Sequence, residues 1–343
     1  MAAPNLLCDT AGMTRARWLN CRMHGPGGTI PYTLGGSDVA VVLASSPWTT
    51  PLELWRIKKG LMKPNDAANA TAKEMGHLME PIVAQCYAAV TGNTIIEDTG
   101  LYQHAAYPYA LANLDYRLEE NGRQGVLECK TTTYHKAGDW ADDQIPYNYE
   151  LQVRFYLAVM DLDFADIACM WGFNPETDMA IRRVNRDRAI EAHIFEQLDA
   201  FIASLHSNTP PDMSDVKPEL ALAALARIYG ASQAGLPTLE FGAKQEKDIR
   251  RLAALQEDIT ALRGELAAKE KEVDAHSVRI AEQMKTNEHG VLEVPGMRYR
   301  VDFVTRVTRR PDSKALKAKY PAAYADVLKA SESRKIKITV EPI

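Results

Sequence analysis

Asp115, Glu128 and Lys130 are the residues whose types and spacing point most directly to chemistry. Two carboxylates can hold a hard divalent cation such as Mg²⁺, which prefers carboxylate and carbonyl oxygens. The backbone carbonyl of Cys129, between Glu128 and Lys130, can add a further ligand. A lysine beside such a cation can orient or deprotonate the attacking water and offset charge on a pentavalent phosphorus. This set is typical of phosphodiester hydrolysis, with Mg²⁺ as the expected cofactor and Mn²⁺ as a substitute.

The segments around these residues predict a strand, a turn and a second strand. Residues 111–118 and 125–132 both alternate with the two-residue period of a strand, and an Asn-Gly pair at 121–122 lies in the turn between them. Alternation puts Glu128 and Lys130 on one face of the second strand, so both side chains look at the same space. The alternative is an exposed hairpin with scattered charges, because Asp and Glu-x-Lys recur often by chance.

Two segments with helical periodicity flank the predicted hairpin. Residues 71–87 have apolar side chains at helical spacing, with Glu80 among them. After the hairpin, residues 149–157 place Gln152 and Tyr156 four positions apart and therefore on one helical face. The opposite face is apolar. We therefore expect Gln152 and Tyr156 to meet whatever lies above the hairpin.

The order of these residues resembles the PD-(D/E)XK nuclease superfamily. Upstream motifs narrow the resemblance to the YqaJ-like viral recombinase family, relatives of the phage lambda exonuclease. The match covers about residues 15–175. The motifs that carry it are Trp18-Leu19-x-x-Arg22, Gly35-Gly36-Ser37-Asp38, Ser46-Pro47-Trp48-x-x-Pro51-x-x-Leu54-Trp55, Gly76-x-x-x-Glu80, Asp115, Glu128-x-Lys130 and Gln152-x-x-x-Tyr156.

This resemblance implies a fold and a set of site residues. The fold is α/β, with a PD-(D/E)XK core in which a mixed sheet is flanked by helices. The implied metal ligands are acidic, the catalytic helix motif lies beside them, and a separate pair binds a terminal 5′-phosphate. The catalytic set is Glu80, Asp115, Glu128, Lys130, Gln152 and Tyr156; the metal ligands are Glu80, Asp115, Glu128 and the Cys129 carbonyl; the 5′-phosphate pair is Arg22 and Ser37.

The resemblance also implies an activity. It predicts a Mg²⁺-dependent exonuclease, with 5′-to-3′ polarity, that resects double-stranded DNA ends for phage-type recombination. A single-strand annealing protein is the expected partner, and a ring-shaped homo-oligomer is the expected assembly. Two alternatives remain: the same metal core serves endonucleases, and a DNA-end-binding recruiter would need little catalysis. A pure binder has no need of Asp115, Glu128 and Lys130 together.

Bulk composition agrees with a soluble globular protein. The chain has 343 residues, of which 46% are hydrophobic and 25% are charged. No stretch approaches the ~20 apolar residues that span a bilayer, and the amino terminus lacks a secretory pattern. A cytoplasmic location, as a phage or prophage protein in a bacterial host, is therefore expected. The five cysteines have no close pairing, which argues against a disulfide framework, a zinc knuckle or an iron–sulfur cluster.

Charge and periodicity divide the chain. The formal net charge is -5, but residues 286–343 hold 12 Lys/Arg and 7 Asp/Glu, a local charge of +5. A heptad spacing of Leu and Ile begins at Leu252, which predicts a long helix that forms a coiled coil or packs on its own domain. The basic tail contacts DNA or an annealing partner, or is simply solvated. The expected domains are an exonuclease domain at 1–212, a helical linker at 213–243, a long helix or coiled coil at 244–285, and a basic hairpin-and-helix extension at 286–343.

Overall fold

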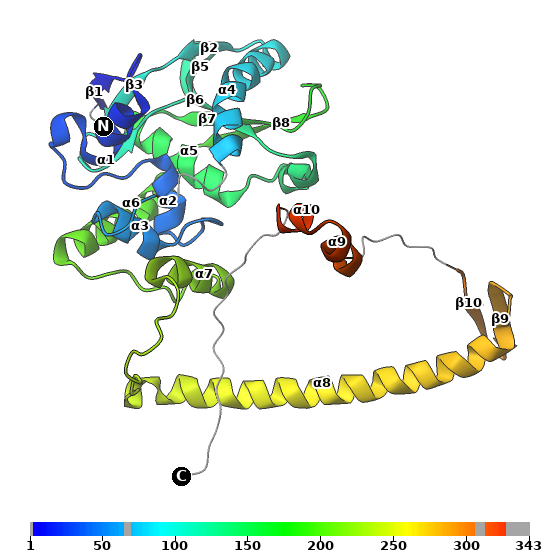
Figure 1. The fold of residues 1–343 in the computed structure, drawn as a ribbon. Coiled ribbons are helices and arrows are strands. Elements are labelled where there is room, and N and C mark those ends of the chain that lie inside the picture. Colours follow the sequence, from blue (N-terminus) through cyan, green and yellow to red (C-terminus); the bar gives the residue numbers. More distant parts are fainter. Residues whose placement is uncertain (1–2, 65–69, 306–312, 327–343) are drawn as a thin grey trace. The chain divides into compact units, whose positions relative to one another are not determined.

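The computed structural model describes residues 3–64, 70–305 and 313–326 (Figure 1). The chain divides into two compact units, residues 1–230 and residues 231–343. All the candidate site residues fall within the first unit. Within the described ranges, no helix is long and apolar enough to cross a membrane.

The first unit is built on a mixed five-stranded sheet. Its third and fourth strands run parallel, and the other neighbours are antiparallel. The parallel pair is connected through helix α5, as parallel strands require a crossover. The fourth strand is buried along its whole length. In order across the sheet, the strands are β2 (Thr94–Glu97), β5 (Tyr116–Glu120), β6 (Arg123–Thr131), β7 (Phe164–Met170) and β8 (Met179–Asn185).

The predicted hairpin is confirmed as β5 and β6. Glu120 pairs with Arg123 across a two-residue turn. The turn residues, Asn121 and Gly122, have φ values of 50° and 77°. Two consecutive positive φ values match the right-handed twist of the flanking strands, and Asn-Gly is the pair that adopts them most readily.

The prediction of one continuous strand over residues 111–118 is wrong. The chain forms β4 (Leu111–Ala112), leaves the strand conformation, and resumes as β5. The reason is long-range hydrogen bonding by two polar side chains. Asn113 donates from Nδ2 to the Gly100 carbonyl at 3.0 Å, and Asp115 accepts the Cys129 N–H at Oδ2 at 2.8 Å. The break places Asp115 against β6.

Helices cover both faces of the sheet. On one face lies α4 (Ala70–Thr91), which packs Val83, Ala84 and Tyr87 against a cluster that includes Leu118 and Leu127. The other face is covered by α5 (Tyr147–Met160), against which α2 (Gly36–Val42) and α6 (Arg188–Ser207) pack, and buried side chains of these three helices belong to the largest core cluster. Figure 1 shows α4 and α5 on either side of β6 and β7. The predicted α/β class, a mixed sheet flanked by helices, is confirmed.

A small second sheet and three short helices complete the region before β5. The sheet has the order β1 (Asn5–Asp9), β3 (Gly100–Gln103) and β4. The helices are α1 (Arg15–His24), the single turn η1 (Pro26–Gly28) and α3 (Pro51–Lys58). Between β6 and α5 lies a further 3₁₀ segment, η2 (Tyr134–Trp140), and α7 (Pro218–Tyr229) ends the unit.

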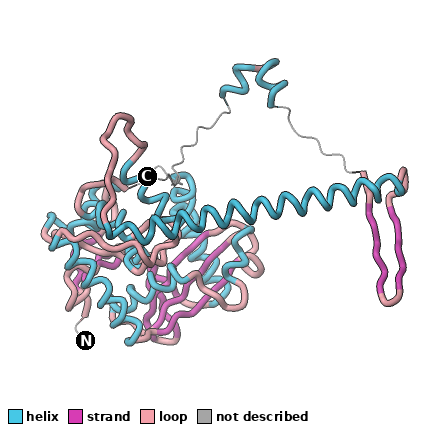
Figure 2. Tube along the Cα trace, turned by 90° about the horizontal axis from the view of Figure 1, so that it is seen from below, coloured by secondary structure: helices cyan, strands magenta, loops and turns pink. Residues whose placement is uncertain are grey.

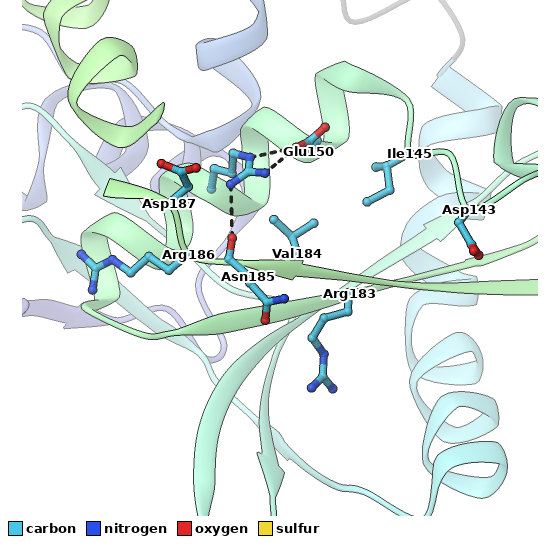
Figure 3. A pocket seen from close by; sticks show the side chains of 9 residues that line it. Asp143, Ile145, Glu150, Arg183, Val184, Asn185, Arg186 and Asp187 are labelled. Carbon is cyan, nitrogen blue, oxygen red and sulfur yellow. Dashed lines mark hydrogen bonds and ion pairs between the residues drawn. The ribbon is translucent and has the colours of Figure 1, made fainter. Parts of the chain in front are cut away.

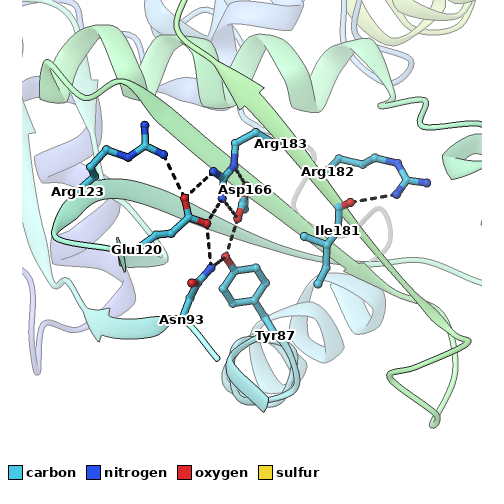
Figure 4. A network of polar contacts seen from close by, with 8 residues as sticks. All are labelled: Tyr87, Asn93, Glu120, Arg123, Asp166, Ile181, Arg182 and Arg183. Atoms are coloured by element: carbon cyan, nitrogen blue, oxygen red, sulfur yellow. Dashed lines mark hydrogen bonds and ion pairs between the residues drawn. The ribbon is translucent and has the colours of Figure 1, made fainter. Parts of the chain in front are cut away.

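A buried charge network ties four elements together (Figure 4). Arg183 on β8 contacts Asp166 on β7 at 2.6 Å and Glu120 on β5 at 2.9 Å. Tyr87 on α4 donates its hydroxyl to Asp166 at 2.6 Å and accepts from Asn93 at 2.9 Å. Asp166 is only 3% exposed. The Arg183 guanidinium compensates the charge of Asp166 and links β8 to β7 and β5. Tyr87 links the same carboxylate to α4.

The second unit begins with a 42-residue helix, α8 (Ala243–Met284). Figure 2 shows it as one continuous helix that leads into a two-stranded hairpin. The strands are β9 (His289–Val294) and β10 (Met297–Asp302), joined at Pro295-Gly296. The short helices α9 (Ser313–Lys319) and α10 (Pro321–Asp326) follow. Apolar side chains of α8 are exposed within the structure of this chain: Leu255, Ile259, Leu262, Leu266, Val273 and Ile280. Pairing of α8 with another helix stays a prediction.

Candidate active site

Strand β6 delivers Glu128 and Lys130 to one face, as strand alternation predicts. Glu128 is 1% exposed, and its Oε1 forms an ion pair with the Lys130 ammonium. Gln152 on α5 donates from Nε2 to the same oxygen at 2.6 Å. The same nitrogen lies 3.0 Å from the Tyr156 hydroxyl, one turn further along α5. Four of the predicted catalytic residues therefore form one continuous polar cluster.

Asp115 joins this cluster from the break between β4 and β5. Its Oδ2 accepts the backbone N–H of Cys129, the residue between Glu128 and Lys130. Burial raises the pKa of Asp115 to about 6, with further repulsion from Glu80, while Lys130 opposes the rise. The Cys129 N–H is thus a positioning group for Asp115, and the Cys129 carbonyl remains a predicted ligand.

Glu80 lies on α4 and is more exposed than the other carboxylates. Its side chain is 31% exposed, and one oxygen is 3.7 Å from His77 Nδ1 on the same helix. Burial and then the charge of Glu128 raise the pKa of Glu80. Helix α4 therefore places Glu80 near enough to Glu128 for the charge of Glu128 to raise its pKa. Among the contacts described, no hydrogen bond joins the two carboxylates.

The electrostatics favour a cation at this cluster. Burial and repulsion from Asp115 raise the pKa of Glu128 to about 7. Burial disfavours the charged form of Lys130, but Glu128 and Asp115 outweigh it and raise the Lys130 pKa above its ordinary value. Lys130 is therefore an ammonium at neutral pH. It can donate hydrogen bonds and stabilise negative charge, and it is poorly suited to remove a proton in this state.

One buried oxygen has no hydrogen-bond partner in the described structure. It is Oε2 of Glu128, the oxygen that Lys130 and Gln152 leave free. An unpaired buried carboxylate oxygen is costly, and a metal ion is a standard way to satisfy it. Across the described residues, no three His, Cys, Asp or Glu side chains gather closely enough to form a ready-made metal site. Glu128 and Asp115 thus fit a divalent cation by their chemistry, with Glu80 at the edge.

The predicted phosphate-binding pair also comes together. Arg22 on α1 donates from Nη2 to the Ser37 hydroxyl of α2 at 3.5 Å. The Arg22 guanidinium lies over the Trp18 ring, 4.7 Å from its centroid. Trp18 is anchored in turn, because its Nε1 donates to Asn113 Oδ1 at 2.9 Å. The Trp18 ring therefore holds the Arg22 guanidinium in place, and Nη2 of Arg22 points toward Ser37.

Gly36 connects this pair to the polar cluster around Glu128. A Cβ built on Gly36 would lie 2.5 Å from the Tyr156 ring and 2.9 Å from Gln152 Cγ. A side chain at this position would force α2 away from α5. Because Gly36 has no side chain, the start of α2 packs closely against α5 at Gln152 and Tyr156. The predicted phosphate-binding pair therefore lies next to the predicted catalytic residues of α5.

Comparison with known proteins finds a family model that this region resembles. Residues 17–163 match the model of the YqaJ-like viral recombinase domain. The Uncharacterized protein YqaJ of Bacillus subtilis (strain 168) is 27% identical over 338 residues, which cover 97% of each chain.

Solved structures of exonucleases show weaker likeness. An alkaline exonuclease, LHK-Exo, from Laribacter hongkongensis is 19% identical, with a TM-score of 0.43 over 57% of this chain and 94% of that one. A phage related exonuclease from Haemophilus somnus 129PT is 11% identical, with a TM-score of 0.38 over 50% of this chain and 93% of that one.

The matched stretch, residues 17–163, contains every site residue predicted above, from Arg22 to Tyr156. The predictions overlooked two residues that position this site. Asn113 is a polar residue within an apolar run two positions before Asp115, a local signal of a strand break. Tyr149 lies at the start of α5, with its ring centroid 5.1 Å from Lys130 Nζ. Nothing local distinguishes Tyr149 from an ordinary helical tyrosine.

A surface hollow of about 400 Å³ lies elsewhere, beside the end of β8 (Figure 3). Its charged side chains are already paired. Arg154 contacts Glu150 at 2.6 Å, and Arg186 contacts Asp161 at 2.5 Å. None of the predicted site residues lines this hollow, so it has no part in the proposed chemistry.

Proposed function

We propose that this chain is a divalent-metal-dependent deoxyribonuclease that degrades double-stranded DNA from its ends with 5′-to-3′ polarity. The observation that carries the proposal is the buried oxygen Oε2 of Glu128, which has no hydrogen-bond partner in the described structure, while Oε1 of the same carboxylate pairs with Lys130. Repulsion from Asp115 contributes to the raised pKa of Glu128. Buried polar atoms with a purely structural role normally have a hydrogen-bond partner. An acidic cluster that leaves one oxygen unsatisfied next to a charged lysine suits metal-assisted phosphodiester hydrolysis.

The residues that would hold the metal are Asp115 and Glu128, with Glu80 and the Cys129 carbonyl completing the set. Mg²⁺, with Mn²⁺ as a substitute, supplies Lewis-acid activation of water and stabilises charge on the phosphate. Carboxylate and carbonyl oxygens are the ligands that both ions accept.

The chain's own side chains do the remaining work. Lys130, as an ammonium, holds an oxygen by hydrogen bonds and offsets the charge that develops on phosphorus. Gln152 fixes Glu128 through Oε1 and leaves Oε2 free to act as a ligand. Tyr156 accepts from Gln152, which holds that amide in a single orientation.

End recognition would rest on Arg22 and Ser37. A terminal phosphate carries more negative charge than an internal one, and a guanidinium can bind it bidentately. The Ser37 hydroxyl adds a further donor beside Arg22. Contact of Gly36 with Tyr156 and Gln152 puts this pair next to the catalytic cluster, as an enzyme that removes terminal nucleotides requires.

We place this activity in phage-type recombination inside a bacterial cell, with a single-strand annealing protein as the partner. The match of residues 17–163 to the model of the YqaJ-like viral recombinase domain supports that setting. The exposed basic strand β10, with Arg298 and Arg300, offers a surface for DNA or for the partner.

The test compares linear duplex DNA with the same sequence as a covalently closed circle, in Mg²⁺. We expect the linear DNA to be degraded and the circle to persist, because an exonuclease needs an end. Cleavage of both at similar rates would contradict the exonuclease proposal in favour of an endonuclease. Binding of ends without degradation in Mg²⁺ or Mn²⁺ would indicate a recruiter.

A further inference from the structure

Trp48 stands at the surface of the first unit on a loop that is held firmly in place. Its side chain is 55% exposed. The loop joins α2 and α3, and the buried hydroxyl of Ser46 accepts the N–H groups of both Trp48 and Thr49 at 3.3 Å. Thr50 then caps α3 in a reciprocal pair with Glu53, at 3.0 and 3.3 Å. Trp48 is therefore an exposed aromatic residue on a backbone segment that hydrogen bonds hold in place.

A row of aromatic rings connects Trp48 to the catalytic lysine. The Trp48 and Tyr149 ring centroids are 6.5 Å apart. Tyr149 lies 5.1 Å from Lys130 Nζ and stacks on Trp140 at 5.9 Å with an interplanar angle of 18°. Trp140 is 3% exposed, so it fixes Tyr149 from the interior. The row begins at the proposed catalytic centre and ends in solvent.

An exposed aromatic at this place suits a nucleobase. Base–aromatic stacking is tolerant of sequence, because every base has a π-face. That tolerance is what a nuclease needs when it degrades DNA of any sequence. Adjacent nucleotides of a strand are about 3.4 Å apart along duplex DNA. The steps from Lys130 to Tyr149 (5.1 Å) and from Tyr149 to Trp48 (6.5 Å) together span about three nucleotides at most. Trp48 can therefore reach a base within about three nucleotides of the phosphate that is cut.

We propose that Trp48 is a nucleobase-stacking residue that holds a base of the DNA strand close to the scissile phosphate. This role rests on the proposed function, since it requires DNA at Lys130. Trp48 belongs to the substrate-binding surface, and the predicted metal ligands and phosphate pair do not include it.

The first experiment uses duplexes with 2-aminopurine at successive positions from one end, bound in EDTA so that binding is observed without turnover. Stacking quenches 2-aminopurine fluorescence, so we expect quenching at one or two adjacent positions. Trp48→Ala should abolish it and Trp48→Phe should keep part of it. Tyr229→Ala is the matched control, because Tyr229 is 65% exposed on α7 of the same unit.

The second experiment removes the stacked base from the DNA instead of the tryptophan from the protein. An abasic nucleotide at the quenched position should weaken binding to the wild-type protein roughly 5-fold to 100-fold, the range that loss of one stacked base produces. It should leave the affinity of Trp48→Ala nearly unchanged, because the same contact is already lost. Equal losses in both proteins would overturn the proposal, as would quenching that persists in Trp48→Ala.

Failure of stacking can be told apart from failure of the proposed function. Cleavage of linear DNA in Mg²⁺ without Trp48-dependent quenching contradicts the stacking role alone. Trp48-dependent quenching without any cleavage supports the stacking role and contradicts hydrolysis. Absence of DNA binding by the wild-type protein overturns the stacking role.

Discussion

At the scale of single residues, the site is dominated by carboxylates that resist ionisation. Asp115 and Glu128 have pKa values of about 6 and about 7, because both are buried and lie near other acidic groups. In the unfolded chain such groups titrate near 4. Between these values the folded state binds more protons than the unfolded state. Stability conferred by these groups is therefore present at low pH and lost as pH rises toward 7.

This linkage predicts a pH-dependent stability of the metal-free protein. In EDTA, the Tm should fall as pH rises from 5 to 7.5, and Mg²⁺ should restore it. Asp115→Asn keeps an acceptor for the Cys129 N–H and removes one charge. It should raise the stability at pH 7.5 by on the order of 2 kcal/mol and flatten the pH dependence. A Tm in EDTA that increases over this pH range would contradict the raised pKa values of Asp115 and Glu128.

A second residue-scale prediction concerns Arg22. Charge-assisted hydrogen bonds contribute ~1.5–3 kcal/mol, so a 5′-phosphorylated end should be degraded roughly 10-fold to 100-fold faster than a 5′-hydroxyl end. Arg22→Ala should erase this preference. Arg17→Ala, an exposed arginine on the same helix, should preserve it. If the wild-type enzyme treats both ends alike, or if the preference survives loss of both Arg22 and Ser37, the assignment of this pair is wrong.

At the scale of elements, local sequence patterns predicted what is locally determined. Strand alternation and the Asn-Gly turn were sufficient for the β5–β6 hairpin, and they placed Glu128 and Lys130 on one face. The break at residues 113–115 could not be predicted this way, because its cause is hydrogen bonding to Gly100 and Cys129, which are distant in sequence.

The network around Arg183 illustrates the same limit. Its charges come from four elements, so no single window of sequence contains the pattern. The placement of Arg22 beside Ser37 depended on the resemblance of the motifs, since a 15-residue separation that includes η1 has no periodic signal of its own.

This network yields an element-scale prediction. Arg183→Ala leaves the buried carboxylate of Asp166 without its cation, and breaking a buried pair costs about 3–5 kcal/mol. Arg123→Ala is the control: Arg123 also contacts Glu120, at 3.1 Å, but its side chain is 61% exposed. Exposed pairs contribute about 0–1 kcal/mol. Denaturant unfolding of both variants measures the difference, and equal losses would mean that Asp166 finds another partner.

At the scale of the whole molecule, the two units have different characters. The first has a large buried core and all the proposed chemistry. The second exposes apolar side chains along α8 and on the β9–β10 hairpin within this chain. A two-stranded hairpin is marginally stable alone, and an exposed heptad stripe is typical of helices that pair.

These exposed apolar faces predict self-association. A closed ring is the assembly we expect if the chain is processive like the ring-forming nucleases that its motifs resemble, and cyclic symmetry is the usual form of such homo-oligomers. Analytical ultracentrifugation at micromolar concentration should give a mass that is a small multiple of 38.1 kDa. Deletion of residues 231–343 tests whether the second unit contributes. A strictly monomeric mass of the full chain, with and without DNA, would count against the ring.

Metal-dependent hydrolysis by the Glu128 and Lys130 cluster is tested by single-turnover degradation of a linear, 5′-phosphorylated duplex in Mg²⁺. Glu128→Ala and Lys130→Ala should each lower the rate by at least ~10²–10³, the usual cost of removing one electrostatic stabiliser or metal ligand. Lys136→Ala, an exposed lysine six residues from Lys130, should cleave like the wild type. Circular dichroism should show that all three variants are folded. Near-wild-type degradation by folded Glu128→Ala would contradict the account, because the hairpin would then be a structural feature without a catalytic role.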